Sequence, residues 1–103
     1  MRAYEYYIRI KAHYPDALIL VSEADSYSAF GHDASFLEHK AGELVHSPTK
    51  PGAGGLRSVR VSNSKLHALA SHMQKLGRSV VVHYPNFQSS RGFVINYTDV
   101  DYG

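Results

Sequence analysis

Basic side chains concentrate in one half of the chain, where they could bind phosphate. Residues 44–98 contain seven lysines and arginines and no acidic residue, whereas residues 1–43 contain four basic and seven acidic residues. Guanidinium and ammonium groups on one surface bind phosphate through charge-assisted hydrogen bonds that read no base sequence. We therefore predict a basic, phosphate-binding surface made by a loop and strand that hold Lys50, Arg57 and Arg60, together with Lys65.

The spacing of these residues leaves an alternative open. In a regular strand Arg57 and Arg60 point to opposite faces, so the charges would scatter over a solvated surface. The stretch 47–55, SPTKPGAGG, is predicted to be a loop. It matches neither the GxxxxGK[ST] nor the GxGxxG pattern, so it does not support a nucleotide site.

Carboxylates and histidines offer two weaker hypotheses. Pro15-Asp16 and Glu38-His39-Lys40 have the letters PD and ExK, a carboxylate and lysine set that can hold Mg²⁺ in a nuclease. Glu38 and Lys40, however, fall on a predicted helix rather than on a strand. The seven histidines include no HExxH or HxH pattern, and no GxSxG motif is present. We therefore expect no metal, no cofactor and no catalytic residues.

The stretch 17–30, ALILVSEADSYSAF, organises the elements around these residues. Ala17–Val21 is an unbroken apolar run, which predicts a buried strand. Asp25–Phe30 alternates, with Ser26 and Ser28 on one face and Tyr27 and Ala29 on the other. This alternation predicts a second strand that is covered on one side and open on the side of the serines.

Helical spacing predicts three helices around these strands. The first covers residues 2–14 and ends before Pro15; the second runs from Asp33, as its N-cap, to about Gly42. The third follows a cap at residues 62–64 and ends at Gly77, with an inward face made of Leu66, Leu69, Ala70, Met73 and Leu76. Further strands are predicted at 43–46, 56–61, 79–84 and 92–98. The expected class is α/β (α+β), a mixed sheet of about six strands flanked by three helices.

Length and composition fit one domain spanning residues 1–103. The chain has no cysteine, which excludes disulfides and thiol chemistry. No apolar run approaches the length of a membrane span, and the N-terminus lacks the apolar segment of a signal peptide. We expect a cytoplasmic protein with no membrane partner.

Four blocks of the sequence resemble the N-terminal domain, domain I, of the MutS family of DNA mismatch-repair proteins. The first block is IKAHYPDALIL, and the second is DSYSAF followed by Asp33-Ala34, where the family has GDFYExF and DA. The helix 66–77 and the GRSVVV segment at 77–82 are the third and fourth. Their order and spacing are those of the family.

The resemblance implies DNA contact through this second block. In the family its Phe-x-Glu segment supplies a phenylalanine that wedges beside a mispaired base and a glutamate that hydrogen-bonds it. Here Ser26 stands at the phenylalanine position and Ser28 at the glutamate position, with Glu23 shortly before them. These three residues are the motif-position candidates for DNA contact. Because serine has no stacking plane, we expect the domain fold without mismatch reading.

We therefore expect a DNA-binding module that contacts the backbone of double-stranded DNA without mismatch specificity and is not an enzyme. The family's other domains and its ATPase do not fit in 103 residues, and Met1 and the unrelated tail at 98–103 favour a free-standing protein. A protein-interaction module with an apolar patch around Tyr84 to Phe87 is the alternative. A metal-dependent nuclease is the third hypothesis.

Overall fold

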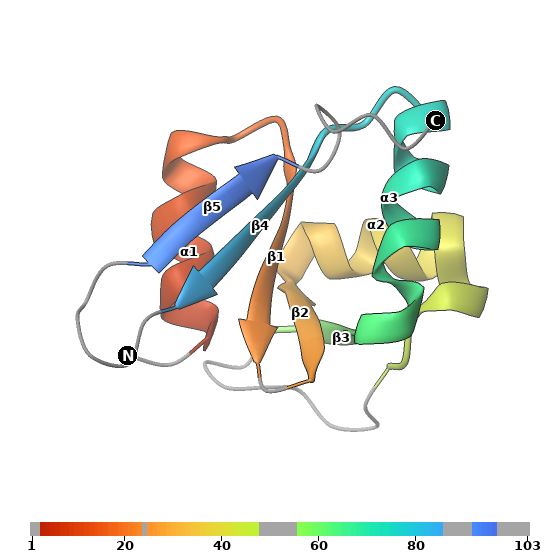
Figure 1. The fold of residues 1–103 in the computed structure, drawn as a ribbon, viewed down its shortest axis with the longest axis horizontal. Coiled ribbons are helices and arrows are strands. Elements are labelled where there is room, and N and C mark those ends of the chain that lie inside the picture. Colours follow the sequence, from red (N-terminus) through yellow and green to blue (C-terminus); the bar gives the residue numbers. More distant parts are fainter. Residues whose placement is uncertain (1–2, 24, 48–55, 86–91, 97–103) are drawn as a thin grey trace.

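The computed structural model describes residues 3–23, 25–47, 56–85 and 92–96 (Figure 1). In chain order the elements are α1 (Ala3–His13), β1 (Leu18–Glu23), β2 (Ser26–Phe30), α2 (Gly31–Ala41), η1 (Gly42–Leu44), β3 (Ser58–Ser62), η3 (Asn63–Lys65), α3 (Leu66–Lys75), β4 (Val80–Pro85) and β5 (Gly92–Asn96), where η marks a 3₁₀ turn. The predicted class, a mixed sheet with three helices, is confirmed.

The sheet has the strand order β3-β2-β1-β4-β5 over the described ranges. β1 pairs with β4 in parallel, and the other neighbours are antiparallel. The prediction of about six strands is wrong because residues 43–46 do not form one. Glu43 and Leu44 belong to the 3₁₀ turn η1, and His46 makes only an isolated bridge to Arg60 on β3.

Helices cover both faces of the sheet, α1 on one side and α2 with α3 on the other (Figure 1). Successive residues of β1 point to opposite faces. Leu18 and Leu20 pack toward α2 and α3, whereas Ile19 and Val21 pack toward α1. All four side chains are fully buried, which confirms the prediction that this apolar run forms a buried strand. Both faces of the strand are covered.

The start of α2 differs from the prediction. The helix begins at Gly31, whose φ of +58° lies in the left-handed region that glycine adopts most readily. The Gly31 N–H donates to the carbonyl of Arg57, which ties the start of α2 to the segment entering β3. The prediction of Asp33 as the N-cap is wrong: Asp33 lies within the first turn and its side chain is buried.

The third helix follows the prediction along most of its length. Leu66, Leu69, Ala70 and Met73 are buried, and Gly77 has the positive φ expected of the residue that ends a helix. Leu76 is 47% exposed, which corrects the predicted inward face at its last position. No side chain of residues 62–64 caps α3; the η3 turn leads into it instead.

In the part of the chain that the structure describes, none of the helices combines the length and apolar character needed to cross a bilayer.

Candidate nucleic-acid interface

The β1–β2 hairpin carries the three motif-position candidates on one face of the sheet. Glu23 lies opposite Ser26 in the antiparallel register, and Val21 lies opposite Ser28. Because directly paired residues share a face, Glu23, Ser26 and Ser28 lie on the side of Val21, which is the α1 side. The hairpin therefore brings the three together, as the motif predicts.

The serine face of β2 is not open, which corrects the sequence-based expectation. Ser28 is 4% exposed and Ser26 is half-buried. The Ser28 hydroxyl donates to Glu23 Oε1 at 2.5 Å, and the Ser26 hydroxyl donates to the backbone carbonyl of Glu23 at 3.2 Å. The alternation could not show this because serine is small and polar enough to be either exposed or buried beside a hydrogen-bond partner.

The four predicted basic residues do not behave alike. Arg57 is exposed and forms a bidentate ion pair with Glu38 of α2. Its Nε donates to Oε1 at 2.5 Å, and its Nη2 donates to Oε2. This contact holds the pKa of the Glu38 carboxyl below its usual value. Arg60 and Lys65 are exposed. Lys50 lies outside the described residues.

Arg60 is the basic residue that the fold brings next to the hairpin candidates. It lies directly opposite Ser28 in the β2–β3 register, so the two side chains emerge on the same face of the sheet. Arg57 precedes β3 and turns instead to α2, which separates the charges of the two arginines, as the alternative interpretation of their spacing anticipated.

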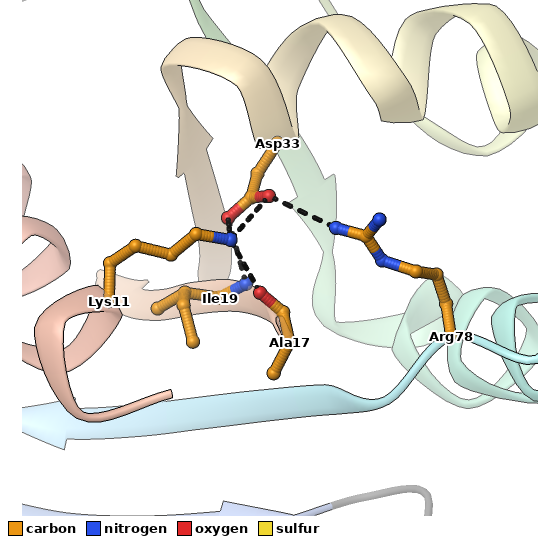
Figure 2. Close-up of polar contacts among 5 residues, drawn as sticks. All are labelled: Lys11, Ala17, Ile19, Asp33 and Arg78. Atoms are coloured by element: carbon orange, nitrogen blue, oxygen red, sulfur yellow. Dashed lines mark hydrogen bonds and ion pairs between the residues drawn. The ribbon is translucent and has the colours of Figure 1, made fainter. Parts of the chain in front are cut away.

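An ionic cluster around the buried Asp33 carboxylate lies at the start of β1, at the end of the strand away from the hairpin turn (Figure 2). Lys11 of α1 donates to both Asp33 oxygens at 3.0 and 3.1 Å and to the Ala17 carbonyl at 2.6 Å. The Ile19 N–H donates to Asp33 Oδ2 at 3.2 Å, and Arg78 lies 3.6 Å from Oδ1. The cluster joins α1, β1, α2 and the segment before β4.

The same carboxylate affects a neighbouring tyrosine. Tyr7 of α1 is buried, and its pKa is raised, first because burial disfavours the phenolate and second because Asp33 is negatively charged and accepts its hydrogen bond. A carboxylate with this many donors satisfies its own hydrogen-bonding capacity inside the protein, so Asp33 is part of the scaffold.

Tyrosines fix β2 to its other neighbours on the α2–α3 face. The Tyr27 hydroxyl donates to Asn63 Oδ1 at 3.0 Å and lies 3.4 Å from the Tyr84 hydroxyl. The Tyr27 and Tyr84 rings meet edge to face, with centroids 6.1 Å apart. Asn63, proposed as a helix cap from the sequence, has this role instead. Tyr84 is half-buried, and Phe87 of the predicted apolar patch lies outside the described residues.

The residues of the nuclease hypothesis do not form a metal site in the described part of the chain. Glu38 lies on α2, as the sequence-based objection expected, and is bound to Arg57, while Asp16 is exposed in the turn before β1. Across the ranges that are described, no group of three or more histidine, aspartate and glutamate side chains could hold a metal ion.

Two contacts were missed by sequence reasoning. The Glu23–Ser28 bond was recoverable in principle, because a hairpin that pairs residue 23 with 26 places residues 23, 26 and 28 on one face. The Lys11–Asp33–Arg78 cluster joins distant segments and leaves no periodic signal.

The family model of MutS domain I matches residues 1–90. The chain belongs to the MutS domain I family, whose members serve in DNA binding and mismatch recognition.

Proposed function

We propose that this domain binds double-stranded DNA through its backbone and does not distinguish mismatched from matched pairs. The observation that carries the proposal is the state of the two motif positions. Ser26 and Ser28 offer no stacking plane, and the hydroxyls of both are already bonded to Glu23. Inserting an aromatic side chain is what makes an unstacked base favourable, and stacking contributes about 1–3 kcal/mol per base.

Backbone binding needs positive charge that is not neutralised within the protein. Arg60 and Lys65 are exposed, and neither makes an ion pair with another described residue. Lys50 is the remaining member of the proposed surface. Arg57 contributes less because Glu38 neutralises it. We further propose a cytoplasmic location.

Fluorescence anisotropy with a matched duplex and the same duplex carrying one mismatch tests the proposal. We expect equal affinities for the two and a steep loss of affinity between low and physiological salt, because bound phosphates release counterions. Arg60→Ala is expected to reduce the salt slope by about one, whereas Arg57→Ala should change it less. Salt-independent binding, no binding at low salt, or a clear preference for the mismatch would refute the proposal.

Restoring the aromatic side chain provides a gain-of-function variant. Ser26 is half-buried and is the first residue of β2, next to the hairpin turn, so a phenylalanine there can project toward solvent. Ser26→Phe is expected to create a preference of about tenfold for the mismatched duplex, near the lower end of the stacking energy. Ser26→Ala is the matched control and should leave the two affinities equal.

A protein-interaction module remains the alternative function. Ile8, Tyr14 and Leu76 are the exposed large apolar residues of the described chain, at 55%, 42% and 47% exposure. They lie on or after two different helices, α1 and α3, and do not single out a docking surface.

A further inference from the structure

Both serines of β2 bind the same residue, Glu23. Ser26 donates to its backbone carbonyl and Ser28 donates to its carboxylate, at 3.2 and 2.5 Å. A hydroxyl–carboxylate distance of 2.5 Å is that of a charge-assisted hydrogen bond. Ser28 is buried whereas Glu23 is exposed, so a fixed donor holds one oxygen of a carboxylate that faces solvent.

In the described part of the chain, no contact occupies the second oxygen of this carboxylate. Glu23 forms no ion pair with a described residue, and the one side-chain hydrogen bond that it makes there uses Oε1. Held in place by Ser28, Oε2 is a pre-oriented acceptor. Pre-orientation matters because a free glutamate side chain would lose rotamer entropy on binding.

A cation lies on the other side of the same serine. Arg60 of β3 is the register partner of Ser28, and side chains paired in this way start about 4.5–5.5 Å apart. Arg60 is exposed. Glu23 and Arg60 therefore flank Ser28 on one face of the sheet, one as an acceptor and one as a cationic donor.

The two groups match the two chemical parts of a nucleotide. A carboxylate repels phosphate but accepts hydrogen bonds from the amino and imino groups of bases. A guanidinium binds phosphate. In a duplex the Watson–Crick N–H groups are paired and stacked, whereas a single strand exposes them. Because serine at position 26 cannot open a duplex, the base must already be unpaired.

We propose that Glu23 and Arg60 form a nucleotide contact that favours single-stranded DNA with exposed base edges. Glu23 accepts a hydrogen bond from the base, Arg60 binds the adjacent phosphate, and Ser28 is the positioning residue that orients Glu23. This inference rests on the proposed DNA binding and adds a ligand preference to it.

Two single strands of about ten nucleotides separate base contact from phosphate contact. One is oligo-dC, and the other has the same backbone with abasic sites throughout. The wild-type protein is expected to bind oligo-dC more tightly than the abasic strand. Glu23→Ala should lower this preference by about three- to tenfold, while its affinity for the abasic strand stays equal or rises because a negative charge is lost.

Asp25→Ala is the matched control for charge. Asp25 is exposed on the same turn, and the hydroxyls of Ser26 and Ser28 both donate to Glu23 and not to Asp25, so removal of the Asp25 carboxylate should leave the preference for bases unchanged. Ser28→Ala should lower the preference partway without changing charge. Arg60→Ala should weaken binding to both strands equally.

Three results would overturn the inference: a wild-type protein that binds both strands equally, an unchanged preference in Glu23→Ala, or equal tightening of both strands by Glu23→Ala, which would mean simple repulsion. If any of these is seen while the protein binds a matched duplex at low salt, the inference fails alone. Absence of binding to every DNA tested would mean that the proposed function has failed.

Discussion

Glu23 and Asp33 are two carboxylates of the same hairpin-to-helix segment, and the fold uses them in opposite ways. Asp33 is 1% exposed and is surrounded by an ammonium, a guanidinium and a backbone N–H. Glu23 is exposed and receives a single hydroxyl. The difference shows that this segment has two parts: its end holds the helices to the sheet, and its start faces solvent, where a ligand can reach it.

The largest expected effect comes from Asp33→Asn, which tests whether Asp33 is structural. The substitution keeps an acceptor for the Ile19 N–H but leaves Lys11 and Arg78 without their counter-charge. Removing one partner of a buried ion pair typically costs 3–5 kcal/mol. Since Lys11 and Arg78 are partly exposed, we expect a loss of about 3 kcal/mol in the free energy of unfolding, measured by urea denaturation.

Glu23→Gln is the matched control for Asp33→Asn because it makes the same chemical change on the exposed carboxylate. We expect its unfolding midpoint to stay close to that of the wild type, as is usual for exposed sites. If Glu23→Gln and Asp33→Asn lose a similar amount of unfolding free energy, the contrast between a structural Asp33 and a solvent-facing Glu23 is wrong.

A smaller effect is expected from His83, a buried polar side chain on the same sheet face as Glu23. Its pKa is lowered because burial disfavours the charged ring and because Arg9 is positively charged. Both ring nitrogens are buried and have no hydrogen-bond partner among the described residues, and Tyr6 packs on the ring with centroids 4.8 Å apart. His83 therefore folds as the neutral form.

The direction of the pH dependence follows from this lowered pKa. The unfolded chain takes up the proton first, near pH 6.5, so stability is full above that pH and falls as the pH drops toward the lower folded-state pKa. One proton limits the slope to about 1.4 kcal/mol per pH unit. His83→Phe should flatten the dependence between pH 7 and 5. If the slope of unfolding free energy against pH is unchanged in this variant, groups other than His83 cause the pH dependence.

The smallest effect is expected at the exposed pair of Glu38 and Arg57. Glu38→Gln removes the ion pair while leaving the fold contacts of α2 intact. Surface pairs of this kind contribute little because both ions are well hydrated. We expect no resolvable change in the urea midpoint, and a large loss would place this contact with Asp33 as part of the scaffold.

Much of the fold could be predicted because local patterns determine it. The apolar run from Ala17 to Val21 became the central strand, and helical spacing located α1 and most of α3. Strand prediction failed at residues 43–46, where the short Glu43–His46 segment forms one bridge after a 3₁₀ turn. A segment of four residues is too short for its sequence pattern to determine its secondary structure.

The chemistry of the candidate site was harder to predict because it depends on pairs across the sheet. Asp33 looked like a helix cap, yet its partner Lys11 lies 22 residues earlier. Ser28 looked exposed because its partner Glu23 comes from the opposite strand. Leu76 looked buried because the helical period continued past the point where the helix ends. In each case the deciding contact is tertiary.

The parallel pairing of β1 with β4 has a consequence for how the domain can be assembled. One edge of β1 pairs with β2, which follows directly in the sequence. The other edge, Leu18–Val21, pairs with Val80–His83 of β4, which is synthesised much later. During synthesis, an apolar strand with unpaired amides stays available until most of the chain has been made. A chain truncated before residue 80 would leave this edge of β1 unpaired, and we expect it to aggregate. For the same reason, we expect that the β1–β2 hairpin alone would not serve as a minimal binding peptide.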